Sequence, residues 1–232
     1  GGNSPDLDNF TEVATALNNA GVACPVVFEV RDGVYNEQIK LYDIPGSSQT
    51  NTITFRGESR DSSLVELHYQ TSNPSNDFTL ALTGADHISF EDMSLLRSNG
   101  TQSVLIQNES NHVGFEHCRL GNVMSPNTSV DKNLTFRNNN IEEHDINLQH
   151  PVNSSAGEVI VENNFLRNLI ITQSGPVSVK RNGIQDPKGY ARDLTINKSK
   201  SIDISDNRLR KIVIKNDTIV SVQDNVIYRN QS

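Results

Sequence analysis

The sequence predicts an all-β fold, a parallel β-helix (solenoid) with an N-terminal capping α-helix, and three observations support this class. The phrase apolar-x-apolar-x-x-Asn-x-apolar returns along the chain, its copies start 18 to 25 residues apart, and 34% of the residues are apolar, with no Trp. A repeated unit too short to hold a helix is typical of a solenoid. A lean apolar content suits many short strands joined by tight turns.

The repeated phrase and its variants occur seven times. The copies begin at His87, His112, Asn133, Glu158, Pro176, Ser201 and Ile219. The shortest unit, of 18 residues, also contains a second short strand, for example 168–172 or 211–215. Longer units add inserts, such as 149–157 and 185–191. We expect regular coils over 78–227, stacked about 4.8 Å apart as parallel sheets, and about nine or ten coils in the whole chain.

The seventh position of the phrase is asparagine in five successive coils. These residues are Asn139, Asn164, Asn182, Asn207 and Asn225. Because equivalent residues of stacked coils lie above one another, we expect a ladder of hydrogen-bonded side-chain amides along the axis. Asparagine also tolerates the left-handed bend that a sharp turn requires, which fits its place at a corner. Met93 and Cys118 hold the same position in the two preceding coils and should face inward. We interpret the ladder as structural.

The N-terminal segment 8–21 predicts a helix that covers the first coil. Asn9 can cap this helix, with Glu12 three residues later completing a capping box, and Gly21 can end it. The apolar face of the helix comprises Phe10, Val13, Ala14 and Leu17. A helix in this place would shield strand edges that otherwise invite aggregation.

Residues 26–70 are expected to form the first coils, with 26–41 as a strand, an Asp-Gly turn and a second strand. The C-terminal end shows no cap, and we expect further chain or another subunit to cover it. The chain starts at Gly1 rather than Met and shows no signal peptide, so we expect an excised or processed piece. We interpret residues 1–232 as one domain.

A specific element, G-x-Y-x-E-Q-I, runs from Gly33 to Ile39. It lies in an opening stretch that reads GGNSPDLDNFTEVATALNNAGVACPVVFEVRDGVYNEQIKL…IPGSSQTNTITFRGES. This stretch, within residues 1–70, resembles right-handed β-helix domains of the pectin-lyase-like superfamily, especially those of secreted and surface proteins of Bacteroidetes-type bacteria. Together with the coil length, the resemblance implies a single-stranded right-handed β-helix. It also implies an extracellular or cell-surface location near polysaccharide, without implying catalysis.

The fifth and sixth positions of the phrase carry the candidate catalytic residues. Arg137, Lys180 and Arg181 could neutralise a uronate carboxylate or abstract its α-proton. Glu116 and Glu162 would be their acidic partners. The alternative, which we favour, is a charge ladder on a solvated sheet face, because four of these five residues alternate in sign from coil to coil.

Metal and cofactor signals are weak. The oxygen ligands that Ca²⁺ prefers are offered by Glu91, Asp92 and Glu116. His87 and His112 should be neighbours on consecutive coils and His117 follows on the same coil, but Zn²⁺ would need a further well-placed ligand. Cys24 and Cys118 give no disulfide framework. We therefore expect no cofactor and leave Ca²⁺ open.

Composition and missing motifs narrow the function. The net charge of −8 argues against nucleic acid as a partner, and no apolar run approaches the length of a membrane helix. The chain lacks the Arg-x-Pro-x-x-Arg phrase of pectate lyases and the Gly-x-Ser-x-Gly elbow of hydrolases. Tyr190 and the inserts 149–157 and 185–191 are the best candidates for contact with a polysaccharide or cell-surface glycan, but we favour the alternative that they are ordinary surface loops.

The sequence therefore favours a non-catalytic extracellular or cell-surface module for adhesion, glycan binding or structural spacing, as part of a larger secreted protein. The alternative is a polysaccharide lyase or hydrolase that acts on an acidic glycan with the charged residues of the exposed sheet.

Overall fold

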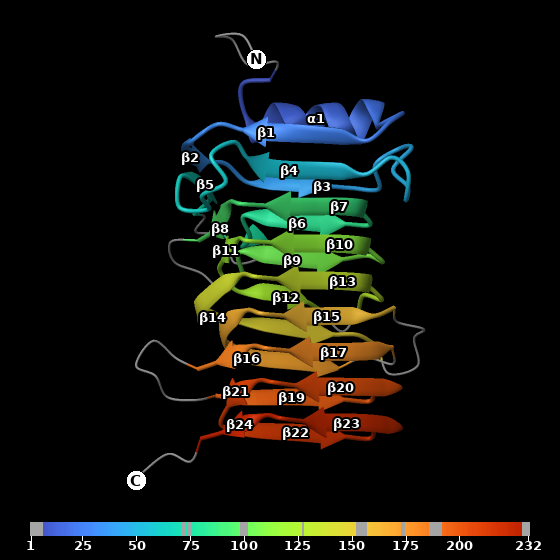
Figure 1. Cartoon of the computed structure of the whole chain (residues 1–232). Coiled ribbons are helices and arrows are strands. Elements are labelled where there is room, and N and C mark those ends of the chain that lie inside the picture. The colour runs from blue at the N-terminus through green and yellow to red at the C-terminus, as the bar shows by residue number, and fades with distance from the viewer. Residues whose placement is uncertain are drawn as a thin grey trace.

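The computed structural model describes residues 7–70, 73, 76–97, 102–126, 128–151, 157–172, 175–185 and 192–228. This part of the chain holds one helix, α1, and 24 strands. Every strand pair is parallel, and each strand pairs with its equivalent one coil away. The strands stack along one axis into two long sheets (Figure 1). The predicted all-β fold of stacked parallel sheets is thus confirmed, in a β-helix-like arrangement.

The first sheet has nine strands, one from each successive coil, in chain order. They are β1 (Val26–Val30), β4 (Ile53–Gly57), β7 (Asp86–Glu91), β10 (Asn111–Glu116), β13 (Lys132–Arg137), β15 (Val159–Glu162), β17 (Pro176–Lys180), β20 (Ser201–Ser205) and β23 (Ile219–Gln223). The copies of the repeated phrase form the strands from β7 onward. Because side chains alternate across a strand, one face of this sheet is buried and the other is exposed.

The second sheet has fifteen strands and contributes the other sides of each coil. Short strands follow the first sheet: β2 (Gly33–Asn36), β5 (Val65–His68), β8 (Ser94–Leu96), β11 (Arg119–Leu120), β18 (Gly183–Ile184), β21 (Arg208–Leu209) and β24 (Val226–Ile227). The returning strands are β3 (Ile39–Leu41), β6 (Leu80–Thr83), β9 (Val104–Gln107), β12 (Val123–Ser125), β19 (Asp193–Asn197) and β22 (Lys211–Lys215). In β14 (Asn140–Gln149) and β16 (Phe165–Thr172) the two segments are continuous, and the register between them shifts within β14.

The predicted strand, Asp-Gly turn and strand over 26–41 are present, but β1 and β2 do not pair with each other as a hairpin would. β1 pairs with β4, whereas β2 pairs with β5, so the turn at Asp32 and Gly33 is a corner between two sheets. A hairpin turn and a corner between two sheets share the same local sequence pattern. Pairing with a later coil replaces pairing within the segment because the solenoid offers each strand a parallel neighbour.

The predicted helix cap is present as α1 (Phe10–Ala20). The Asn9 side chain accepts a hydrogen bond from the Glu12 backbone N–H at 2.8 Å, and Gly21 ends the helix at φ +69°. The Glu12 carboxylate accepts from the Asp8 backbone N–H, one residue before the cap. The four predicted apolar residues are buried, and Phe10 lies against Phe55 at the end of the core.

The inner face of the first sheet forms a continuous core column. Its N-terminal part is a stack of Phe28, Phe55, Phe90, Phe115 and Phe136, with adjacent ring centroids 5.1 to 5.5 Å apart. Its C-terminal part continues in register with Val161, Val179, Ile204 and Val222. The column therefore changes from aromatic to aliphatic halfway along the axis.

The five predicted ladder asparagines form a continuous hydrogen-bonded row. The Oδ1 of Asn164 accepts from both the backbone N–H and the Nδ2 of Asn139, at 2.9 and 3.0 Å, and Asn182, Asn207 and Asn225 repeat this arrangement. Each Nδ2 also donates to a strand carbonyl, for example that of Val161 from Asn182. The amide therefore satisfies the backbone groups that a sharp corner leaves unpaired.

The expected left-handed bend lies one residue before the ladder. The residues with positive φ at this corner are Asp92, His117, Asn138, Asn163, Arg181, Asp206 and Asp224, at φ 52° to 59°. Asn, Asp and His are the non-glycine types most tolerant of this conformation. The ladder asparagines themselves do not adopt it, because their side chains must point inward to reach the next amide.

Candidate functional site

The exposed face of the first sheet carries the predicted charged residues. Its strands place the fifth position of each copy in one row, in register from Arg56 of β4 to Gln223 of β23. A second outward row, two residues earlier in each strand, carries mainly Ser, Thr and Gly. The strand alternation that buries the core column thus also builds two polar rows on the outside.

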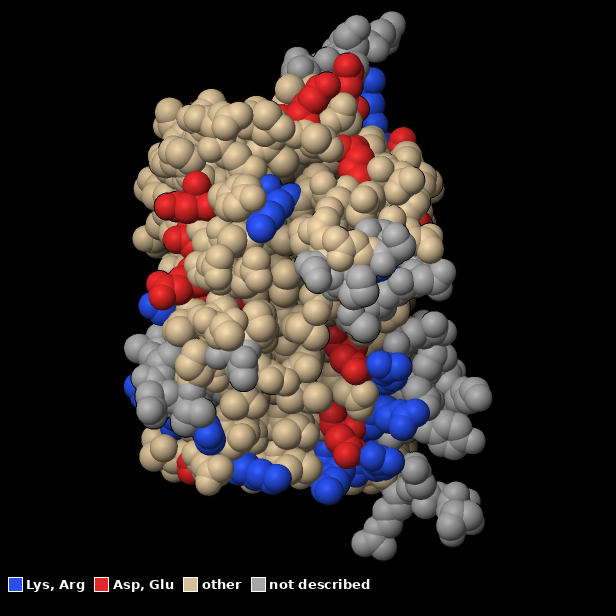
Figure 2. Space-filling model, turned by 180° about the vertical axis from the view of Figure 1, so that it is seen from behind, with Lys and Arg blue, Asp and Glu red and all other residues tan. Residues whose placement is uncertain are grey.

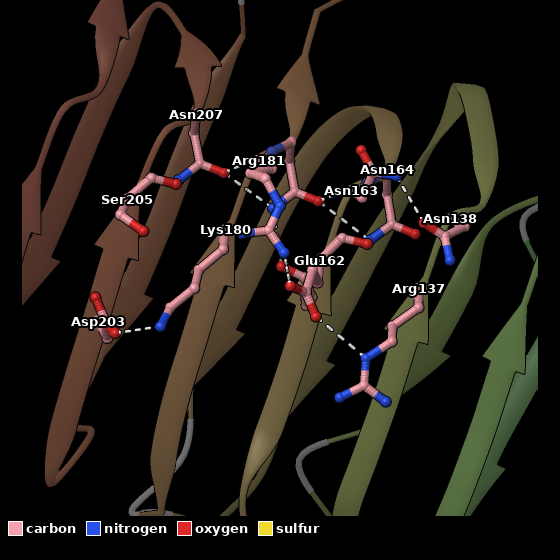
Figure 3. A network of polar contacts seen from close by, with 12 residues as sticks. Arg137, Asn138, Glu162, Asn163, Asn164, Lys180, Arg181, Asp203, Ser205 and Asn207 are labelled. Carbon is pink, nitrogen blue, oxygen red and sulfur yellow. Dashed lines mark hydrogen bonds and ion pairs between the residues drawn. The ribbon is translucent and has the colours of Figure 1, made fainter.

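The C-terminal part of the charged row is a chain of ion pairs (Figure 3). Arg137 Nε lies 3.2 Å from Glu162, and Arg181 contacts the other oxygen of the same carboxylate. Lys180 Nζ lies 2.5 Å from Asp203 of the next coil. All three cationic candidates for catalysis are therefore held by carboxylates.

The pairing differs in part from the predicted alternation. Lys180 is in register with Glu162 but pairs with Asp203, which belongs to the other outward row and was not among the predicted residues. Arg56, also missed, pairs with Glu91 at 2.5 Å. Diagonal neighbours can reach across a sheet as well as direct ones, so the row position alone does not determine the partner.

Glu116 differs from the other charged residues of its row. It lies between Glu91 and Arg137, but Arg137 is turned toward Glu162. The Glu116 carboxylate accepts one hydrogen bond from the Asn138 side chain at 3.3 Å, and among the described residues it forms no ion pair. Two carboxylates, Glu91 and Glu116, are thus neighbours on adjacent strands.

An open depression of about 510 Å³ lies over this part of the sheet. Its floor includes Ser89, Gly114 and Thr135 of the polar row, and the charged row borders it on one side. Ser89 Oγ lies 3.0 Å from Thr54 Oγ1, so these two hydroxyls can hydrogen-bond. On its other side the depression is bordered by His87 and His112.

Gly114 makes the hollow in the floor. The residues before and after it in the row, Ser89 and Thr135, both carry side chains. A Cβ built on Gly114 would meet only Ser89 Cβ, at 3.6 Å, which is ordinary contact. The φ of Gly114 is not in the positive range. Neither backbone strain nor crowding therefore requires a glycine at this position.

His87 and His112 form a stacked pair at the edge of the depression. Their ring centroids are 4.3 Å apart with an angle of 11° between the planes. Both residues have positive φ, +55° and +53°. Burial lowers the pKa of His87, and the neighbouring His112 lowers it further, so the neutral imidazole is favoured. His117 lies at the opposite end of β10, where its Nδ1 is 3.7 Å from Asp92.

Of the three predicted calcium ligands, Glu91 and Glu116 are neighbours on adjacent strands, but Asp92 does not join them. Glu91 faces outward to Arg56, whereas Asp92 follows the bend and lies near Arg60 and His117. Within the described part of the chain, no group of three His, Cys, Asp or Glu side chains is placed to hold a metal ion. Both cysteines are free, Cys24 exposed and Cys118 buried.

A buried polar cluster escaped the sequence analysis. Ser125 Oγ donates to Asp131 at 2.5 Å, and His150 Nε2 lies 3.1 Å from the same Ser125 oxygen. Asp131 also accepts from Ser129 and from the Ser110 backbone N–H. The side chains of Asp131 and His150 are fully buried, so no substrate reaches them. Because Ser125 donates its hydroxyl hydrogen to Asp131 and not to His150, the cluster does not have the arrangement of a nucleophilic triad.

The opposite side of the molecule offers a different distribution of charge (Figure 2). In that view Lys and Arg gather over the lower, C-terminal coils, while Asp and Glu are more frequent higher up. The described residues leave out most of both inserts, namely 152–156 and 186–191, which includes Tyr190. The predicted contacts from these inserts therefore have no structural account.

Comparisons with known proteins add no family to this picture. No protein-family model, curated protein or solved structure was found to match the chain. The one helix of the described residues, 11 residues long, falls short of what a membrane-spanning helix needs.

Proposed function

We propose that the chain is a right-handed β-helix module of a secreted or cell-surface protein, and that it binds glycan without cleaving it. Adhesion to a glycan-coated surface would follow from such binding. The pectin-lyase-like resemblance of the opening stretch supports the handedness and the location. The handedness is also supported by the general rule that connections between parallel strands of one sheet are right-handed in about 98% of cases.

The observation that carries the non-catalytic part of the proposal is that all three candidate cations are paired with carboxylates. A lyase needs a base and a cation that are available to the substrate. Here Arg137 and Arg181 share Glu162, and Lys180 contacts Asp203 at 2.5 Å. A substrate carboxylate would have to displace a protein carboxylate from each of them.

The observation that supports glycan binding is the polar depression on the same face. Ligand sites are concave, have volumes of about 300–1,000 Å³, and hold a few polar groups that fix orientation. The depression of about 510 Å³ lies within this range and combines hydroxyl, imidazole, carboxylate and guanidinium groups. A sugar presents hydroxyls that both donate and accept, which these groups can match.

The proposal is tested by measuring binding and turnover in parallel. Binding is read on a glycan array, and turnover by the absorbance of unsaturated products from alginate, pectate and chondroitin, each with and without Ca²⁺. We expect binding without product. Product formation that disappears in Arg137→Ala or Lys180→Ala but persists in Lys215→Ala would instead establish a lyase. Silence in both assays would leave structural spacing as the function.

A further inference from the structure

We propose that the depression over Gly114 is a subsite for one pyranose unit that carries no negative charge. This inference rests on the proposed glycan-binding function and gives it a place and a ligand class. Three independent features of the described residues carry it: the unexplained glycine, the excess of carboxylates and the stacked imidazole pair.

The glycine is the first feature. A glycine inside a strand weakens the strand and offers no side chain to pack, and it often marks a place where a ligand approaches the backbone closely. Gly114 has room for a Cβ and an ordinary φ, so the fold gains nothing from it. The flanking row residues Ser89 and Thr135 are compatible with strand structure, which shows that the row accepts side chains. A sugar ring resting on the Gly114 backbone accounts for the exception.

The charge of the lining is the second feature. Glu91 and Glu116 border the depression as neighbours, and Glu158 lies at its end. Arg137 also borders it, but its guanidinium is engaged by Glu162, and Glu91 is likewise paired with Arg56. Glu116 and Glu158 are therefore the lining carboxylates that form no ion pair among the described residues. The field in the depression is therefore negative, and it repels a uronate or a sulfated sugar. The Glu116 carboxylate, with one amide donor at 3.3 Å, can accept from a sugar hydroxyl or ammonium group.

The imidazole pair is the third feature. Two stacked rings 4.3 Å apart would repel each other if both were charged. The lowered pKa of His87 keeps that ring neutral near pH 7. A neutral imidazole donates from one nitrogen and accepts at the other, which suits a hydroxyl and adds no attraction for an anion. Asn133, whose Nδ2 lies 3.4 Å from His112 Nε2, adds an amide on the same side.

The experiment uses three oligosaccharide probes with the full chain: cellohexaose, a chitosan hexamer with free amines, and hexagalacturonate. Affinities are measured by calorimetry for the unmodified chain, for Gly114→Val and for the control Ser178→Val. Ser178 lies in the same outward row three strands further along and does not line the depression. A β-branched residue suits either position in a strand.

We expect the chitosan hexamer to bind at least as tightly as cellohexaose, and hexagalacturonate to bind at least 10-fold more weakly. Gly114→Val should lose at least 10-fold in affinity for both bound probes while its unfolding midpoint stays the same or rises. Ser178→Val should bind within 2-fold of the unmodified chain. If Gly114→Val does not fold, Gly114→Ala, whose Cβ fits without displacement, replaces it with an expected loss of at least 3-fold.

Two results would overturn the inference while leaving glycan binding intact. One is unchanged affinity in a folded Gly114 variant, and the other is tightest binding of hexagalacturonate. Failure of the unmodified chain to bind any glycan on the array would instead remove the proposed function itself. The variant Glu116→Gln separates the charge contribution, because it should weaken the affinity for the chitosan hexamer at least 3-fold more than the affinity for cellohexaose.

Discussion

The two halves of the coil stack are stabilised in different ways. In the N-terminal half, the core column is a stack of phenylalanines, and the corner position of two coils holds Met93 and Cys118, both buried. In the C-terminal half, the column is aliphatic and the corner position holds the asparagine ladder. Aromatic stacking supplies large apolar burial, whereas the ladder supplies hydrogen bonds. The comparison teaches that one coil geometry tolerates either source of stability.

The outer faces of the same two halves also differ. The C-terminal half closes its charges into ion pairs, with Glu162 shared by two arginines. The N-terminal half leaves Glu116 without a cation among the described residues and holds the depression over Gly114. The half whose core relies on apolar packing therefore presents the open polar surface. We infer that binding and structural roles are divided along the axis.

The largest expected effect is the loss of an aromatic ring from the stack. Phe90→Ala should reduce the free energy of unfolding by about 3–5 kcal/mol, because it removes a fully buried ring and leaves a cavity between Phe55 and Phe115. Chemical denaturation measures it. Ile204→Val in the aliphatic half should cost only about 0.5–1.5 kcal/mol. Similar costs for the two variants would contradict the division of the core.

Breaking the ladder should have the next largest effect. Asn182→Ala removes the acceptor for the Asn164 backbone N–H and amide and the donor to the Val161 carbonyl. The Asn164 amide keeps the Phe136 carbonyl as an acceptor, whereas the Asn164 backbone N–H loses its partner. We expect a loss of about 1–3 kcal/mol, read from the denaturation midpoint. The control Asn147→Ala, on a partly exposed face of β14, should change stability by no more than about 0.5 kcal/mol. Equal losses of stability in Asn182→Ala and Asn147→Ala would show that the ladder does not stabilise the fold.

The exposed ion pairs should matter least for stability. Lys180→Ala removes the contact with Asp203, and both side chains are partly exposed, at 33% and 45%. Such pairs contribute about 0–1 kcal/mol. Denaturation in low and high salt checks this, since screening should erase most of the difference. A cost well above 1 kcal/mol that persists in salt would mean that the row is more rigid than a solvated charge ladder.

The two native cysteines, one exposed and one buried at the corner, allow the packing of the corner to be tested without a mutation. Burial raises the pKa of the Cys118 thiol to about 12, while Cys24 is exposed. In the native state at pH 8, mass spectrometry should find alkylation at Cys24 and none at Cys118. Because the folded pKa of Cys118 is raised, its contribution to stability is complete below the unfolded value near 8.5 and declines as the pH rises toward 12. Rapid alkylation of Cys118 would indicate that the corner opens.

Much of the fold could be predicted because the repeat carries it. The period of the repeat fixes which residues stack, so the ladder asparagines follow from it. The helix cap follows instead from its capping residues and from the helical spacing of its four apolar residues. The left-handed residue lies one position before the ladder asparagine, because a sharp corner and an inward amide need two adjacent residues with different backbones. Asn138 and Asn164 show the two roles in neighbouring coils.

The site was harder to predict because it depends on side-chain directions. Row positions are readable from the sequence, but whether Arg137 turns to Glu116 or to Glu162 is decided by local packing. Gly114 was visible as the one glycine between the two inward apolar residues of a repeated phrase, yet it gains meaning only once the register places it between Ser89 and Thr135. When the coils are aligned with one another, a glycine that has no structural reason at its position is the sequence signal that could have indicated the depression.

The central claim, that the exposed face of the first sheet binds glycan through the Gly114 depression, is tested most directly by amide mapping. An ¹⁵N-labelled chain is titrated with the chitosan hexamer, and backbone amide shifts are followed by NMR. We predict that the shifts gather at Ser89, Gly114 and Thr135 while the ladder amides stay unchanged. Shifts confined to the second sheet, or to the ion-paired strands β15 to β20, would contradict the claim.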